Sequence, residues 1–300
     1  MPTLHPVVQA DFPTSLVLSI TPPPALSSHT TNVLILLHGL GDTAVSFTSL
    51  GKQLALPETT CISLQAPTPL PLELGGFHWG DDITFDQASG QMDFDTGFNK
   101  AVKIIKQDII ENGLIKKCGY KAREIMLFGF GQGAMAALAT AASVAEELGG
   151  IVSIGGPLAS SNISAKAVKT PVLVLGGSSS TLITRTALDK LKAAFQNVEY
   201  QKWNRAGDGM PRNRDEMLPI MRFFARQLRS RAGVPEGSVE NVNVGPADKA
   251  QRLEKQRLSR PDLKQALHHE EKTHRFELLY VGCRQDKWQF WQYNILKVKR

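Results

Sequence analysis

The chain has 300 residues, of which 42% are hydrophobic, and its 34 Lys and Arg against 28 Asp and Glu give a net charge of +6. This length is enough for one large α/β core, and no apolar run reaches the ~20 residues that a membrane-spanning helix requires. Residues 248–300 hold 13 of the basic and 7 of the acidic residues, so they carry the whole charge excess. An affinity for anionic partners is therefore expected of this tail alone.

The cysteines and the N-terminal segment indicate the cellular compartment in which the protein is expected. Cys61, Cys118 and Cys283 are odd in number and scattered, which favours a reducing environment without a disulfide framework. We expect Cys61 and Cys118 to be ordinary core or surface residues. The opening "MPTLHPVVQADFP" has neither the basic region nor the apolar region of a secretory signal. The prediction is a cytoplasmic protein.

Strand and helix patterns alternate from about residue 14 to residue 230. The first predicted elements are strands over 14–20, 32–39 and 61–67 and a helix over 44–56. Residues 68–95 follow, rich in Pro, Gly and Asp, and a loop of this length is typically functional or a lid. The later predicted elements are helices over 96–115, 132–148, 182–195 and 213–230 and strands over 124–130, 150–156, 171–177 and 198–203.

Continuous apolar strands that alternate with helices predict an α/β domain, residues 1–232, with a mostly parallel sheet covered on both faces. Sites in such sheets form at the carboxyl ends of the strands. The sequence places "HGLGD", "GFGQG", "IGGPLASS" and "GGSSST" at those ends.

The amino-acid composition changes after the domain. Residues 233–247 read as a Gly/Pro/Val linker, and residues 248–300 as a basic helical tail that is partly unstructured. The closing "KWQFWQYNILKVKR" has aromatics among basic residues, which could stack on nucleic acid or lie on a membrane surface. Because no folded RNA-binding motif is visible, docking to a protein partner or disorder is favoured for the tail.

Residues 127–134, "LFGFGQGA", have the frame of a nucleophile elbow, G-x-S-x-G, in which a strand turns sharply into a helix. Gly131 stands where the serine belongs. A non-glycine residue at such an apex is strained by about 1–3 kcal/mol, and glycine removes both the strain and the hydroxyl.

The segments "LILLHGLGDTAVSFTSLGKQL", "QAPTPLPL", "HWGDD", "GFGQGAMAAL" and "VSIGGPL" resemble the phospholipase/carboxylesterase family of α/β-hydrolases, to which acyl-protein thioesterases belong. The resemblance covers about residues 14–230. It implies an α/β-hydrolase fold, no cofactor and no metal, and hydrolysis of thioester and oxygen-ester bonds by a Ser-Asp-His triad in that chain order.

Carried over residue by residue, the triad is missing. The resemblance places Gly131 at the nucleophile position, Ser180 at the acid and Met210 at the base. One observation does not depend on this alignment, because no histidine occurs between Trp79 and Leu267. Without a nucleophile and a base, the hydroxyl activation that acyl transfer requires is absent.

The oxyanion hole requires only main-chain donors, which the resemblance assigns to Leu40 and Gln132, with Trp79 packed over the pocket. Such donors could still bind a carbonyl or carboxylate oxygen. The sequence therefore predicts a catalytically inactive member of the family that binds an acyl or small apolar ligand or acts as an interaction protein.

Alternative interpretations remain open. An active hydrolase could use displaced residues, with Ser178–Ser180 as the nucleophile cluster and Asp208 and His38 in support, although His38 is structural in the family. The tail could make the protein a nucleic-acid or membrane adaptor. A nucleotide site at "GFGQGA" lacks a well-placed acidic residue. We interpret the carboxylates that follow Trp79 as a solvated rim and not as a metal site: Asp81, Asp82, Asp86, Asp93 and Asp95.

Overall fold

The computed structural model describes residues 5–24, 30–71, 74–85, 93, 95–160 and 167–230. The predictions for Asp86, for the linker 233–247 and for the tail 248–300 lie outside these residues. Among the described residues, no helix combines the length and the apolar character needed to cross a bilayer.

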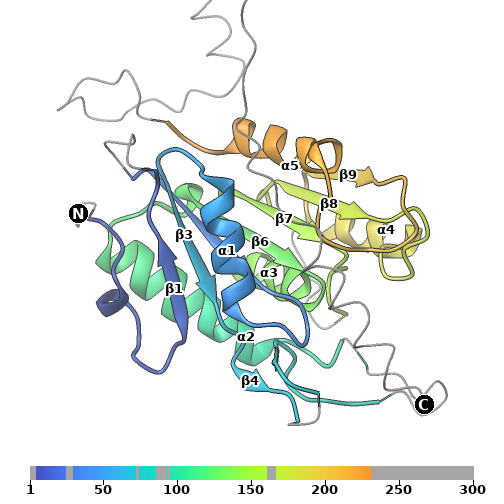
Figure 1. The fold of residues 1–300 in the computed structure, drawn as a ribbon, viewed down its shortest axis with the longest axis horizontal. Helices are drawn as coiled ribbons and strands as arrows, with labels where there is room; N and C mark the ends of the chain where they lie inside the picture. The colour runs from blue at the N-terminus through green and yellow to red at the C-terminus, as the bar shows by residue number, and fades with distance from the viewer. Residues whose placement is uncertain are drawn as a thin grey trace, which may run out of the picture. The chain divides into compact units, whose positions relative to one another are not determined.

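A seven-stranded sheet forms the centre, in the order β1-β3-β2-β6-β7-β8-β9 (Figure 1). Its strands are β1 Leu18–Thr21, β2 Asn32–Leu37, β3 Thr59–Leu64, β6 Ile125–Phe130, β7 Gly150–Ile154, β8 Val172–Gly176 and β9 Val198–Lys202. Only β1 runs antiparallel to its neighbour, and every other pair is parallel. The predicted mostly parallel sheet is confirmed.

The helices are α1 Ala44–Leu54, α2 Asn99–Lys103, α3 Gln132–Ser143, α4 Arg185–Ala194 and α5 Arg214–Gln227. Helix α2 continues into η2, Ile104–Lys117, with wider π-type turns. Short 3₁₀ turns form at η1, Gln9–Asp11, and η3, Ala122–Glu124. A two-stranded ribbon, β4 Thr68–Pro69 with β5 Phe77–His78, lies within the long loop after β3.

Two apolar clusters lie on the two faces of the sheet, as β2 illustrates. Val33, Ile35 and Leu37 belong to one cluster and Leu34 and Leu36 to the other, because successive side chains of a strand point to opposite faces. The first cluster includes side chains of α2, η2, α3 and α4, and the second those of α1 and α5. This arrangement explains why the strand is apolar at every position from Val33 to Leu37.

Each predicted helix differs from the observed one by a few residues at one or both ends, and two of these differences have a visible cause. The helix expected over 96–115 begins at Asn99, because Gly97 has a φ of 86° and the Asp81 carboxylate accepts hydrogen bonds from the main-chain N–H groups of Asn99 and Lys100. The helix expected over 132–148 ends at Ser143, since Val144 is extended at φ −77° and ψ 132°.

The two outer strands of the sheet are β1 and β9. Strand β9 is the more exposed, and none of its side chains is fully buried. The Glu199 carboxylate of this strand pairs with the Arg226 guanidinium of α5 at 2.6 Å.

Candidate functional site

The turn between β6 and α3 has the backbone of a nucleophile elbow. Gly131 lies at its apex with a φ of 53° and a ψ of −120°, a region that L side chains rarely adopt. Its N–H donates to the carbonyl oxygen of Ile154 at 2.8 Å, and its own carbonyl accepts from Ala134 at the start of α3. The strand-turn-helix context that the sequence predicted is therefore present.

Space at the apex is open. A Cβ built on Gly131 would meet no atom of the described residues within 4 Å. A serine side chain would therefore fit sterically, and the cost of a non-glycine residue here is conformational.

The glycines on either side of Gly131 are required for close packing. A Cβ on Gly129 would lie 2.5 Å from the main-chain nitrogen of Ala134. A Cβ on Gly133 would collide with the carbonyl oxygens of Leu37 and His38 at the end of β2. These contacts place the start of α3 directly against the end of β2.

The two segments that meet at this junction contain the predicted main-chain donors. Leu40 is half-buried in the turn after β2, and Gln132 is the first residue of α3. Neither N–H group has a hydrogen-bond acceptor among the described residues. The first N–H groups of a helix have no acceptor within the helix itself, and an anionic oxygen is a favourable partner for them.

Trp79 joins the two sides of the junction. Its main-chain N–H donates to Oε1 of Gln132 at 2.7 Å, and its indole Nε1–H donates to the carbonyl oxygen of His38 at 2.8 Å. The Trp79 side chain is completely buried. Trp79 therefore links the end of β2 to the start of α3.

His38 is a structural histidine. Its Nε2 accepts from the main-chain N–H of Ala66 at 3.0 Å, which leaves the proton on Nδ1, and Nδ1 donates to the carbonyl oxygen of Gly39 at 2.7 Å. Burial lowers the pKa of this imidazole, so the ring is neutral near pH 7. Since both nitrogens are occupied, His38 does not serve Ser180 or Asp208 as a base.

The loops after β8 and β9 bring Ser180 to Asp208. The Ser180 hydroxyl donates to Oδ2 of Asp208 at 2.7 Å, and Oδ1 of Asp208 accepts from the N–H of Gly177 at 2.8 Å. The Ser180 oxygen also accepts from the N–H groups of Leu182 and Ile183. The serine at the predicted acid position thus connects the two loops.

Ser178 and Ser179 are exposed, and their main-chain N–H groups donate to the carbonyl oxygens of Arg205 and Ala206. The predicted serine cluster therefore does not converge as a unit, because Ser180 alone contacts Asp208.

Met210 is half-buried and packs on the apolar cluster that includes Trp203. The Arg205 guanidinium fixes this loop: it donates to the carbonyl oxygens of Gly209 and Met210, lies 4.4 Å from the Trp203 ring centroid and pairs with Glu216 at 3.2 Å. A side chain with no proton to exchange thus occupies the predicted base position.

The acidic residues after Trp79 bind main-chain groups of their own segment and its neighbours. Asp81 receives the N–H groups at the start of α2, and Asp95 accepts from the N–H of Ser160 at 2.8 Å. Among the described residues, these carboxylates do not form a group of potential metal ligands. They stabilise loops and a helix start.

The two buried thiols are protonated near neutral pH. Cys61 and Cys118 are free and buried, and burial raises the pKa of each thiol to about 12. Neither is therefore a thiolate nucleophile near neutral pH.

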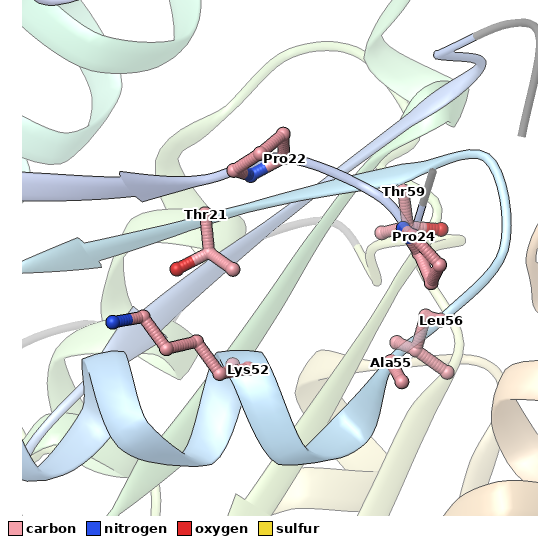
Figure 2. Close-up of a pocket in the computed structure, with 8 residues that line it drawn as sticks. Thr21, Pro22, Pro24, Lys52, Ala55, Leu56 and Thr59 are labelled. Atoms are coloured by element: carbon pink, nitrogen blue, oxygen red, sulfur yellow. The ribbon is translucent and has the colours of Figure 1, made fainter. Parts of the chain in front are cut away.

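A shallow groove of about 370 Å³ lies elsewhere, beside the C-terminal end of α1 and the chain that leaves β1 (Figure 2). It is lined by Thr21, Pro22, Pro24, Gly51, Lys52, Ala55, Leu56 and Thr59. Helix α1 runs back from the carboxyl ends of the strands, so this groove lies at the opposite edge of the sheet from Gly131 and does not involve the predicted ligand pocket.

The family model described as Phospholipase/Carboxylesterase matches residues 25–227. The chain belongs to this family. A similar curated protein is an uncharacterised hydrolase of Schizosaccharomyces pombe, 35% identical over 205 residues, which are 66% of this chain and 83% of that protein. Acyl-protein thioesterase 1 of Saccharomyces cerevisiae is 32% identical over 135 residues, 41% of this chain and 56% of that protein.

Solved structures agree on the fold. Arabidopsis thaliana SOBER1 matches with a TM-score of 0.53 and 24% identity, covering 66% of this chain and 99% of that one. Zea mays acyl-protein thioesterase 2 matches with a TM-score of 0.52 and 20% identity, covering 71% and 99%. At these identities the likeness establishes the α/β-hydrolase fold alone.

Sequence reasoning missed the side-chain contact between Gln132 and Trp79, which joins positions 53 apart in the chain. It also missed a cluster of His5, Asp11 and Cys118, whose ligand atoms lie within 4.8 Å of one another. No local pattern marks either contact, since the partners come from distant segments.

Proposed function

We propose that this protein is a non-hydrolytic member of the phospholipase/carboxylesterase family that binds an acyl or small apolar ligand at the turn between β6 and α3, or presents that turn to a protein partner. The observation that carries the proposal is Gly131, which holds the apex backbone of an elbow and supplies no nucleophile.

The surroundings of Gly131 support binding. The N–H groups of Leu40 and Gln132 are available to an oxygen of a ligand, and open space at Gly131 admits a group where a serine side chain would stand. The acyl class comes from relatives that are named acyl-protein thioesterases.

The surroundings of His38 and Met210 support a lack of turnover. His38 is neutral and has both nitrogens hydrogen-bonded, while Met210 packs on an apolar cluster. In a serine protease, the triad contributes on the order of 10⁶ in kcat. We expect a loss of similar order here.

The first test is turnover by the full-length protein. We expect no hydrolysis of p-nitrophenyl acyl esters and no labelling by a fluorophosphonate probe above a heat-denatured control. Labelling of any serine in the folded protein contradicts the proposal.

The second test is binding, measured as the shift of the thermal midpoint with fatty acids of graded length. A matched pair of variants isolates the space at the apex: Gly131→Ala and Gly131→Leu carry the same backbone strain, but only leucine fills the open space. We expect the shift to survive in Gly131→Ala and to disappear in Gly131→Leu. Equal shifts in both variants place the ligand elsewhere.

A second candidate function rests on the contact between Ser180 and Asp208, in which a carboxylate accepts the proton of a hydroxyl at 2.7 Å. Such a pair could give a weak ester or thioester hydrolase that uses displaced residues. This function predicts activity that Ser180→Ala abolishes and Gly131→Ala leaves unchanged. The non-hydrolytic proposal predicts no activity in any of the three proteins.

A further inference from the structure

Three potential metal ligands from distant parts of the chain meet beside the C-terminal end of η2. They are His5, Asp11 at the end of η1, and Cys118, which directly follows η2. One ligand atom of each lies within 4.8 Å of the other two. Asp11 and Cys118 are buried, whereas the His5 side chain is 42% exposed.

The N-terminal segment is held where it brings these residues together. The main-chain N–H of His5 donates to the carbonyl oxygen of Cys118 at 3.2 Å. The Phe12 ring lies against Gly113 of η2 so closely that a Cβ at Gly113 would be 2.5 Å from it. The Lys117 ammonium donates to the carbonyl oxygen of Asp11 at 2.8 Å. The cluster is therefore part of the packed fold.

The carboxylate of Asp11 is already oriented. Oδ2 accepts the N–H of Val8 at 2.8 Å, while Oδ1 lies 3.8 Å from Nε2 of His5. Two tetrahedral ligands at bond lengths of 2.0–2.3 Å are separated by roughly 3.3–3.6 Å. The separation of Oδ1 and Nε2 is close to this value, and the remaining pairs, within 4.8 Å, need to close by about 1.5 Å at most.

The His5 ring is arranged as a metal ligand commonly is. Nδ1 lies 2.9 Å from the carbonyl oxygen of Pro6, so an Nδ1–H can donate there and leave the lone pair on Nε2. Nε2 lies 3.0 Å from the carbonyl oxygen of Lys117. A metal bound at Nε2 therefore requires this carbonyl to move aside or to become a further oxygen ligand.

We propose that His5, Asp11 and Cys118 form a binding site for a divalent transition metal of the zinc class. One nitrogen, one oxygen and one sulfur ligand suit a borderline-soft ion, and two anionic ligands neutralise its double charge. On binding, the Cys118 thiol transfers its proton to solvent and the sulfur bonds the metal as a thiolate. Three protein ligands leave the fourth tetrahedral position to water or another ligand.

This site is independent of the proposed function. Helix η2 runs back along the sheet, so Cys118 lies at the edge where β6 begins, whereas Gly131 follows the end of β6. The metal would tie the N-terminal segment to the domain core at the edge opposite the elbow.

The test is a titration of the chelator-treated full-length protein with Co²⁺, which gives a near-ultraviolet charge-transfer band when a thiolate coordinates it. We expect a band that saturates at one equivalent and is displaced by Zn²⁺. Cys118→Ser should abolish the band, and His5→Ala should weaken Co²⁺ binding by about tenfold or more. Zn²⁺ should raise the thermal midpoint of the wild type and leave that of His5→Ala unchanged.

Two controls keep the result interpretable. Cys283→Ser removes the thiol outside the described residues and should leave the band intact. If Cys118→Ser does not fold, Co²⁺ binding by His5→Ala still tests the proposal. This variant should fold, because the His5 side chain is half-exposed and is not part of the core. A folded wild type without a thiolate band, or a band that depends on Cys283, overturns the proposal and leaves the cluster as a hydrogen-bonded anchor.

Discussion

The turn after β6 and the loops after β8 and β9 are held in place in different ways. At the turn the apex dihedrals and the packed glycines of an elbow are present, and the N–H groups of Leu40 and Gln132 have no acceptor among the described residues. At the loops the side chains of Ser180, Asp208 and Arg205 make a different set of bonds. The turn is therefore fixed by main-chain packing, whereas the loops are fixed by bonds between side chains.

The largest effect should come from restoring the side chains. In Gly131→Ser/Ser180→Asp/Met210→His, the new carboxylate would meet that of Asp208, whose Oδ2 lies 2.7 Å from the Ser180 oxygen. Two adjacent carboxylates do not both ionise readily. We therefore add Asp208→Asn and expect p-nitrophenyl ester hydrolysis about 10³-fold or more above the background rate that the wild type shows, part of the ~10⁶ that a triad supplies.

The triple variant that keeps Asp208 is the matched control and should be slower than the quadruple variant. Gly131→Ser alone should stay inactive because it has no base. A quadruple variant that folds but does not hydrolyse would show that the loops after β8 and β9 cannot bring the new acid and base to residue 131.

The next effect concerns the apex backbone. Gly131→Ala should reduce the free energy of unfolding by about 1–3 kcal/mol, because the methyl group has room but the positive φ is strained. Gly207→Ala is the control, since its Cβ also meets open space and its φ lies outside the strained range. It should stay within about 0.5 kcal/mol of wild type in urea unfolding. Equal costs for the two variants would contradict a strained apex.

A somewhat smaller loss of stability is expected from substitution of Ser180 in the loop after β8. Ser180→Ala removes the hydrogen bond to Asp208 and the acceptor of two main-chain N–H groups, and should cost about 1–2 kcal/mol. Ser179→Ala, at an exposed neighbour, should be within about 0.5 kcal/mol of wild type. Chemical denaturation of the two variants measures the difference, and a neutral Ser180→Ala would show that the contact does not hold the loops.

The smallest expected effect is on how the free energy of unfolding depends on pH, through His38 at the end of β2. Because burial lowers the pKa of His38 in the folded protein, the unfolded chain binds more protons below its ordinary pKa of about 6.5. Stability should therefore fall as the pH drops below this value, by up to about 1.4 kcal/mol per pH unit. His38→Gln, which keeps an acceptor near Ala66, should show a shallower slope between pH 6.5 and 5. An unchanged slope would mean that His38 does not titrate on unfolding.

Most of the fold was predictable because the central strands are largely apolar and most are followed, directly or after a loop, by a helical pattern. The prediction extended α3 to residue 148 because Glu146, Glu147 and Leu148 favour a helix locally, while tertiary context ends it at Ser143. The start of α2 was misplaced because the Asp81 carboxylate that receives its first N–H groups comes from a distant loop.

At the candidate site, sequence reasoning identified Gly131 as the apex, because the spacing of Gly129 and Gly133 reflects real contacts with Ala134 and with the end of β2. The roles of the side chains were less accessible. Trp79 was expected to pack over a pocket, and its actual bonds to His38 and Gln132 depend on three segments that only the fold brings together.

The exposed outer strand β9 affects whether copies of this protein can aggregate by pairing their sheets. An edge strand offers unpaired main-chain groups to any extended segment that approaches it. Here Glu199 and Lys202 place charge of both signs along five residues, and Arg226 of α5 lies against Glu199. Pairing with a second sheet would require these charged groups to be desolvated. We therefore expect strand β9 to resist sheet-to-sheet aggregation in concentrated solution.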